Sequence, residues 1–245
     1  MESSDMIYGT RAVMEAIRAG KQIEKILIQS GLTNDLIKEL IYTAKENQVA
    51  YTFVPAEKLK RMSSKNHQGV ITLLSSVTYV PLQNVIDKAY NEGREPFFII
   101  LDRVTDVRNF GAIVRTAECA GVDAIIIGEK GSAPITSDAM KTSAGALNYL
   151  PVCREKDIRK TIKFLHENGI RILACTEKTP KTIFEADVTG PVAIIMGSEE
   201  DGISNELLRD ADELVSIPMK GKIGSLNVSV ATGVAIYEIV RRRAS

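Results

Sequence analysis

Four short segments rich in apolar residues constrain the fold more than any other feature of the sequence. They lie at 97–101, 124–127, 171–175 and 192–196. Strands with one face in water alternate apolar and polar residues, whereas continuously apolar strands are buried on both faces, as in parallel sheets covered by helices. Helical patterns fall between them, near 111–120, 137–143 and 156–168. From Phe97 onward, the chain therefore predicts an α/β domain with a parallel sheet.

The first third of the chain predicts a smaller α/β unit over residues 1–76. The patterns indicate helices over 7–19 and 34–47, a short helix from Pro55, and strands near 26–28, 51–54 and 69–74. Thr10 is the expected N-cap of the first helix. Residues 77–95 are expected to form a linker that contains a helix over 82–90. The parallel-sheet domain is expected to occupy residues 96–245.

Composition excludes several classes of protein. Lys+Arg and Asp+Glu both number 31, and a neutral total still permits local patches that bind nucleic acid. The apolar runs are too short to cross a bilayer, and the polar N-terminus argues against a signal peptide. Three scattered cysteines fit a reducing, cytoplasmic location. With two histidines and no paired cysteines, no metal site is expected.

Three polar loops follow predicted strands, at 102–111, 197–202 and 217–229. In open α/β sheets, ligands bind beyond the carboxyl ends of the strands. None of the loops contains GxGxxG or GxxxxGK[ST], so neither a standard dinucleotide fold nor a P-loop NTPase is supported. Gly221 and Gly224 are expected to let the third loop turn tightly around a ligand.

Together the three loops resemble the motifs of the SpoU family of RNA ribose 2'-O-methyltransferases, within the knotted SPOUT class. The matching segments are 109–117, 196–203, and 217–219 followed by 225–231. Segments 8–16 and 67–70 look like the ribosomal-protein-like substrate-binding domain of the family members that act on ribosomal RNA. The resemblance thus extends over most of the chain.

The resemblance implies a deep trefoil knot at the C-terminus, S-adenosylmethionine bound in the knot loops, and a homodimer that completes the active site. By position, the implied cofactor contacts are Gly197, Ile217, Met219 and Leu226. The implied catalytic residues are Asn109, Arg115, Glu199, Ser225 and Asn227.

Each of these side chains also has a plainer interpretation. Arg115 could pair with a surface acid; as a permanently protonated group it suits a bidentate phosphate contact better than a role as general base. Asn109 could cap the helix that follows it, and Ser225 and Asn227 could cap the last helix. Glu199 could be a solvated loop acid.

The last stretch, 228–240, has conflicting signals. Its valines favour a strand, but its small residues suit a closely packed helix. We expect a helix, because Leu226, Val230, Val234 and Tyr237 fall on one face. The three arginines at 241–243 suit a helix C-terminus. They are expected either to be solvated or to contact phosphate.

A basic segment in the first unit is the expected RNA contact. It contains Lys58, Lys60, Arg61, Lys65 and His67, and the plainer alternative is an ordinary helix end. The sequence thus predicts methylation of the ribose 2'-hydroxyl of a guanosine in 23S ribosomal RNA. A transfer RNA methyltransferase is the nearest alternative. An inactive RNA-binding assembly factor and an unrelated doubly wound binding protein are the others.

Overall fold

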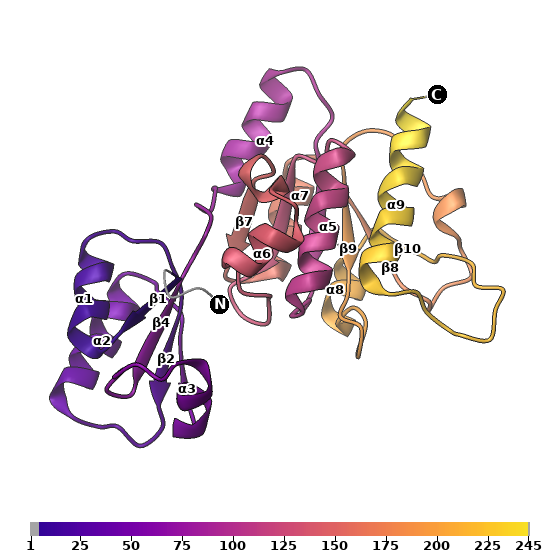
Figure 1. Cartoon of the computed structure of the whole chain (residues 1–245). Helices are drawn as coiled ribbons and strands as arrows, with labels where there is room; N and C mark the ends of the chain where they lie inside the picture. The colour runs from indigo at the N-terminus through magenta and orange to yellow at the C-terminus, as the bar shows by residue number, and fades with distance from the viewer. Residues whose placement is uncertain (1–4, 245) are drawn as a thin grey trace. The chain divides into compact units, whose positions relative to one another are not determined.

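The computed structural model describes residues 5–244, which form two compact units (Figure 1). The first comprises the residues up to Thr78 together with Pro134–Asp138. The second comprises Tyr79–Ala133 and the residues from Ala139 on.

The first unit is a four-stranded sheet with three helices. Its elements are β1 (Met6–Tyr8), α1 (Thr10–Arg18), β2 (Ile23–Gln29), α2 (Asp35–Glu46), β3 (Tyr51–Val54), α3 (Ala56–Met62) and β4 (Val70–Leu74). The strand order is β1-β4-β2-β3; β4 is antiparallel to both neighbours, and β3 is parallel to β2. Side chains of α1 and α2 pack with β2 in one core, and Leu59 of α3 packs with Leu27 and Ile71 in another. The helices therefore cover both faces of this sheet.

The predicted start of the first helix is wrong. Residues 6–8 form β1, because they pair with β4, Met6 opposite Leu73. The N-cap of α1 is Gly9, at φ 84°, and no side chain caps the helix there. Glycine tolerates this conformation better than other residues. Long-range strand pairing thus overrides the helical pattern at this position.

The second unit is built on six parallel strands, as expected. Its strands are β5 (Phe97–Leu101), β6 (Ala124–Gly128), β7 (Val152–Glu155), β8 (Arg171–Cys175), β9 (Val192–Met196) and β10 (Glu213–Val215), in the order β10-β8-β9-β5-β6-β7. Its helices are α4 (Leu82–Asn91), α5 (Val107–Cys119), α7 (Ile158–Glu167), α8 (Asn205–Asp210) and α9 (Val228–Arg243). A further helix, α6 (Ser137–Thr142), begins in the segment assigned to the first unit and ends in the second. Short 3-10 turns lie at Ala146–Asn148 and Ile183–Glu185. The sequence patterns missed β7 and α8, which are short.

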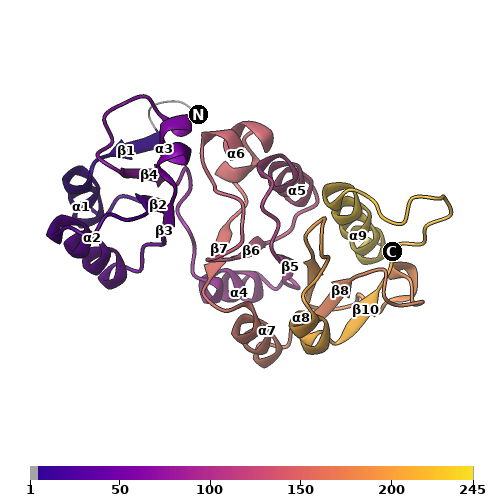
Figure 2. The same cartoon turned by 90° about the horizontal axis from the view of Figure 1, so that it is seen from below.

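Helices cover both faces of the parallel sheet. Figure 2 shows α4, α7 and α8 on one side of the strands and α5 and α9 on the other. Leu82, Val85 and Ile86 of α4 are buried against strand residues such as Phe98. The expected linker over 77–95 therefore contains a helix of the second unit's core.

The helix expected after residue 227 is present as α9, but its predicted buried face is wrong. The helix buries Val228, Thr232, Ala235, Ile236 and Ile239. Val230 and Tyr237 are 52% and 50% exposed. The apolar stripe that predicted this helix is thus a partly exposed surface in the single chain.

The C-terminal arginines are not a solvated tail. Arg242 donates to the carbonyl of Ala186 at 2.7 Å, and Arg243 donates to those of Glu95 and Gly190 at 3.2 and 2.6 Å. These bonds fix the last turn of α9 to loops that precede β5 and β9. The trefoil knot stays a prediction.

Candidate active site

A cavity of about 620 Å³ lies beyond the carboxyl ends of β8, β9 and β10. Parallel strands place their carboxyl ends at one edge, where ligands bind in open α/β sheets. All four residues predicted to contact the cofactor, Gly197, Ile217, Met219 and Leu226, line it. Glu199, Ser225 and Asn227 also line it. The cavity therefore gathers two of the three loops that the sequence singled out.

Gly197 is required by close packing within the loop that follows β9. A Cβ atom at this position would lie 2.2 Å from the carbonyl carbon of Gly202. Ser198 and Gly202 form an isolated antiparallel bridge, which folds the loop back on itself. The expectation for Gly221 and Gly224 is wrong, because neither has a positive φ and neither is crowded.

Arg103 holds this loop from outside the cavity. Its guanidinium donates to the Asp201 carboxylate and to the Gly202 carbonyl, both at 3.0 Å. The neighbouring Asp102 is 8% exposed and accepts a hydrogen bond from the Ser204 amide at 2.7 Å. Arg103 itself has φ 57°, a left-handed backbone. The loop after β5 thus fixes the loop after β9.

Three predicted catalytic residues meet through hydrogen bonds. The amide nitrogen of Asn227 donates to Asn109 Oδ1 at 3.0 Å and to Glu199 Oε1 at 2.5 Å. Asn227 is also the N-cap of α9, since its Oδ1 accepts from the Ser229 amide at 3.0 Å. All three motif loops therefore contribute to one polar cluster.

Asn109 is not the cap of its helix. Helix α5 begins one turn earlier, and Asp106 caps it by accepting from the backbone amides of Arg108 and Asn109, both at 2.8 Å. Asp and Asn are about equally good caps, so residue type alone does not distinguish Asp106 from Asn109, the cap considered from the sequence. Because Asp106 caps the helix, the side chain of Asn109 is available for other contacts.

Ser225 and Arg115 have no internal partner. Ser225 is exposed at the cavity wall, and Arg115 is exposed on α5. Within residues 5–244, neither side chain makes a hydrogen bond or ion pair, and Arg115 does not line the cavity. The structure therefore brings four of the five predicted catalytic residues together and leaves Arg115 apart.

The charged residues that line the cavity are all acidic. They are Glu177, Glu199, Glu200 and Asp201. Such a lining favours a cationic ligand. Burial raises the pKa of the Cys175 thiol in the cavity wall to about 11, so this thiol stays protonated and is a poor nucleophile. Sequence reasoning missed Cys175 and Glu177, although their place at the end of β8 could have indicated them.

The predicted RNA contacts lie on and after α3 in the first unit. Lys58, Lys60 and Arg61 are exposed, and Lys58 and Arg61 share a face of the helix because they are three residues apart. The Lys65 ammonium lies 5.2 Å from the centre of the Tyr8 ring. His67 Nδ1 accepts from the Gly69 amide at 3.0 Å, so this histidine stabilises a turn.

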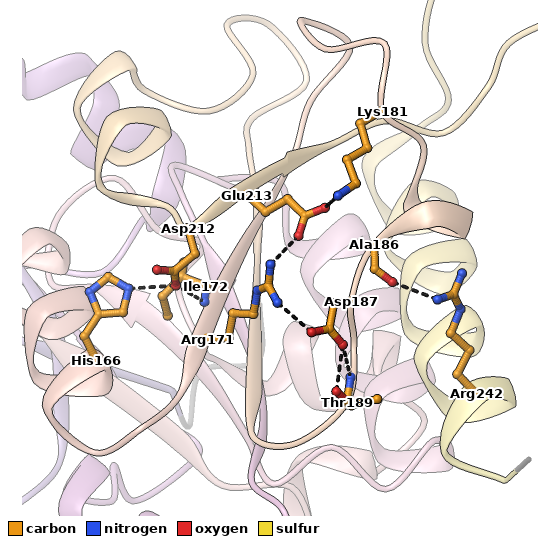
Figure 3. A network of polar contacts seen from close by, with 10 residues as sticks. All are labelled: His166, Arg171, Ile172, Lys181, Ala186, Asp187, Thr189, Asp212, Glu213 and Arg242. Carbon is orange, nitrogen blue, oxygen red and sulfur yellow. Dashed lines mark hydrogen bonds and ion pairs between the residues drawn. The ribbon is translucent and has the colours of Figure 1, made fainter.

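A second polar cluster lies around the beginnings of β8 and β10 (Figure 3). Arg171 donates to Asp187 at 2.9 Å and to Glu213 at 2.6 Å, and Lys181 also pairs with Glu213. Asp212 accepts from the Ile172 amide at 2.7 Å and contacts His166 Nε2 at 2.9 Å. These residues pair with one another, and we name them the edge network.

No group of three histidine, cysteine, aspartate or glutamate side chains in residues 5–244 is arranged to hold a metal ion. In the same part of the chain, no helix combines the length and apolar character needed to cross a membrane.

Comparison with known proteins gives consistent matches over the whole chain. Residues 96–237 match the SpoU rRNA Methylase family, and residues 6–80 match a domain described as RNA 2'-O ribose methyltransferase substrate binding. A putative TrmH family tRNA/rRNA methyltransferase from Bacillus subtilis, YacO, is 30% identical over 99% of this chain and 97% of its own length. An uncharacterized tRNA/rRNA methyltransferase from Synechocystis, slr0955, is 36% identical over 99% of this chain, which spans 64% of that protein.

The fold also has solved counterparts. The SpoU methyltransferase AviRb from Streptomyces viridochromogenes, in complex with the cofactor AdoMet, aligns with a TM-score of 0.62 and 24% identity. The alignment covers 98% of this chain and 90% of AviRb. At this identity the likeness concerns the fold.

Proposed function

The chain belongs to the SpoU rRNA Methylase family, and from that membership we propose that it methylates the ribose 2'-hydroxyl of a guanosine in 23S ribosomal RNA. Membership makes it an S-adenosylmethionine-dependent RNA methyltransferase. The ribose position, the nucleotide and the preference for ribosomal RNA are the proposal. We also propose that it works in the cytoplasm, with its RNA substrates.

The observation that carries the proposal is the cavity beyond β8, β9 and β10. Gly197, Ile217, Met219 and Leu226 line it, as the family motifs lead one to expect of cofactor contacts. S-adenosylmethionine carries a sulfonium and an ammonium, and the charged side chains of the lining are all carboxylates. Its volume lies within the usual range of small-molecule sites, about 300–1,000 Å³. The residues present therefore fit this cofactor.

Bound S-adenosylmethionine supplies an activated methyl group. In the proposed reaction it would supply this methyl group to the ribose oxygen, and the hydroxyl proton would pass to solvent. The protein must hold the hydroxyl in line with the methyl group and favour the developing negative charge on oxygen. Ser225 and Asn109 are the proposed donors at that oxygen.

We assign Arg115 to the RNA phosphate beside the reacting ribose. Its guanidinium is exposed and unpaired within residues 5–244, and such a fork suits a bidentate phosphate contact. Arg115 stands outside the cavity of its own chain, so we propose that it serves the cavity of a second copy in a homodimer. The exposed apolar residues Val230 and Tyr237 on α9 support such an interface.

RNA selection is assigned to the first unit, with Lys58, Lys60, Arg61, Lys65 and His67 as contacts. The match of residues 6–80 to a substrate-binding domain supports this division of labour. The names of the relatives include both tRNA and rRNA, so transfer RNA is the second candidate substrate.

Mapping ribose methylation in a deletion strain tests the substrate. The expected result is the loss of one 2'-O-methylguanosine from 23S ribosomal RNA, restored by the wild-type gene and not by an Arg115→Ala variant. A lost methyl group in transfer RNA instead would establish the second candidate. Calorimetry on the purified protein supplies the cofactor test, since absence of S-adenosylmethionine binding would exclude the enzyme.

A further inference from the structure

The amide group of Asn227 has no hydrogen-bonding capacity left. An asparagine side chain has two N–H donors and two acceptor positions on oxygen. Both donors are used, by Asn109 Oδ1 at 3.0 Å and Glu199 Oε1 at 2.5 Å. Both acceptor positions are used as well, by the backbone amide of Ser229 at 3.0 Å and its hydroxyl at 2.6 Å. Asn227 can therefore contact RNA only by giving up one of these bonds.

The partners of Asn227 also fix which way its amide faces. An ionised Glu199 carboxylate only accepts, and the Ser229 backbone amide only donates. A flipped Asn227 would set its oxygen against the Glu199 carboxylate and its NH2 against the Ser229 N–H. The Ser229 hydroxyl adds a second donor on the oxygen side. The orientation of Asn227 is thus imposed from both sides.

The orientation of Asn227 also determines the orientation of the Asn109 side chain. Because Asn109 Oδ1 accepts from Asn227, the NH2 of Asn109 is directed away from Asn227. That NH2 has no acceptor within residues 5–244, and Asp106 already caps the helix that carries it. Asn109 therefore presents a free, oriented NH2 group, and the exposed side chains of Ser225 and Arg115 are also unpaired within residues 5–244.

We infer that the polar cluster divides into a positioning set, Glu199, Asn227 and Ser229, and a substrate-facing set, Asn109 and Ser225. Ser229 is a new member of the site, and Asn227 becomes a positioning residue that acts through Asn109. The inference rests on the proposed function, because it assigns roles within the methyl-transfer site. The orientation of the two side-chain amides, however, does not depend on the proposed function.

A double-mutant cycle between Asn109 and Asn227 tests the division. Asn227→Ser removes the NH2 group. It keeps a side-chain oxygen that can cap α9, and so avoids the cost of an uncapped helix. On an unmodified 23S ribosomal RNA transcript, Asn109→Ala is expected to lower kcat about 100-fold, in the range measured for losing one aimed donor. Asn227→Ser is expected to lower kcat about tenfold, and the double variant should be no slower than Asn109→Ala. Two effects that multiply would overturn the inference, because independent contacts are additive in free energy.

Ser229 provides the matched pair of variants. Ser229→Ala is expected to lower kcat about fivefold, the usual worth of one neutral hydrogen bond. Ser229→Thr keeps the hydroxyl and should restore the rate. The KM for S-adenosylmethionine and the unfolding temperature should stay unchanged in both. Equal rates for Ser229→Ala and wild type, or no rescue by Ser229→Thr, would remove Ser229 from the site.

A measurement without substrate separates this inference from the proposed function. In the free protein, the side-chain NH2 signals of Asn109 and Asn227 report their hydrogen bonds by NMR. Asn227→Ser should shift the Asn109 signals, because Asn109 Oδ1 loses the hydrogen bond that it accepts from Asn227, whereas the surface change Arg209→Ala should not. Unshifted Asn109 signals would refute the amide contact even if methyl transfer is observed. Shifted signals in a protein that transfers no methyl group would instead refute the proposed function.

Discussion

Two polar clusters in the second unit contain similar residues but differ in whether those residues are paired within the protein. The edge network around Arg171 and Glu213 pairs its charges with one another, and the Glu213 side chain is only 9% exposed. The cluster around Asn227 lies beyond the other ends of the strands and leaves Arg115 exposed and without a partner within residues 5–244. Polar groups that are satisfied internally stabilise the fold. Unsatisfied groups on rigid elements are available for a substrate.

The largest effect on activity is expected at Arg115. Arg115→Ala should lower methyl transfer by about 100- to 1,000-fold, the range for losing one preorganised charge-stabilising donor. The unfolding temperature and the affinity for S-adenosylmethionine should not change, because Arg115 is exposed and does not line the cavity of its own chain. Single-turnover transfer to RNA measures the rate, with the exposed Arg209→Ala as control. Full activity in Arg115→Ala would show that its lack of partners has no functional meaning.

In the edge network, substitution is expected to lower stability and to leave methyl transfer intact. Arg171→Ala leaves the nearly buried Glu213 carboxylate with Lys181 as its remaining cation. Breaking a buried ion pair costs about 3–5 kcal/mol, and the partial exposure of Arg171 reduces this to about 2–3 kcal/mol. The unfolding temperature should fall by about 5–10 °C, with normal methyl transfer below that temperature.

Arg159→Ala is the matched control for this change. The Arg159–Asp210 pair is short, 2.6 Å, but the Arg159 side chain is 59% exposed. Exposed pairs contribute little to stability, so only a small thermal shift is expected. Equal shifts for the two variants would contradict the structural role of the edge network.

Arg103 combines features of the two clusters, and its substitution provides a third prediction. Arg103 is partly exposed and satisfied, yet it braces a loop that lines the cavity. Arg103→Ala should weaken S-adenosylmethionine binding about tenfold by loosening that loop, as expected for the loss of charged hydrogen bonds. Calorimetric titration measures the affinity, and Arg103→Lys should recover part of it. An unchanged affinity would show that the loop holds its shape through Asp102 alone.

The smallest effect concerns pH. A hydrogen bond from Arg241 on α9 lowers the pKa of Glu238 to about 2, and Arg242 contributes as well. A depressed carboxyl pKa adds stability above the unfolded-state pKa and loses it as the pH falls through the folded value. Glu238→Gln should therefore be about 1–2 kcal/mol less stable than wild type at pH 7. The difference should shrink between about pH 4.5 and pH 2. A difference that is constant across this range in chemical denaturation would contradict the assignment.

The sequence predicted the parallel sheet because buried strands must be apolar throughout, as Phe97–Leu101 shows. It failed where long-range pairing decides the structure, as when residues 6–8 joined β4. Motif positions singled out Asn109, Glu199 and Asn227, which the structure joins by hydrogen bonds, but they did not indicate the division of roles that we infer. That division depends on contacts 28 and 118 residues apart in sequence, which no local pattern encodes. The stripe containing Val230 and Tyr237 indicated a helix correctly, although these residues do not face the core of the single chain.

The location of the transferred methyl group tests the central claim most directly. Wild-type protein is incubated with methyl-labelled S-adenosylmethionine and unmodified ribosomal RNA, and the RNA is digested to nucleosides for mass spectrometry. Label is expected in 2'-O-methylguanosine, from wild type and Arg171→Ala alike and not from Arg115→Ala. Label on a base, or no label from the folded wild-type protein, would contradict it.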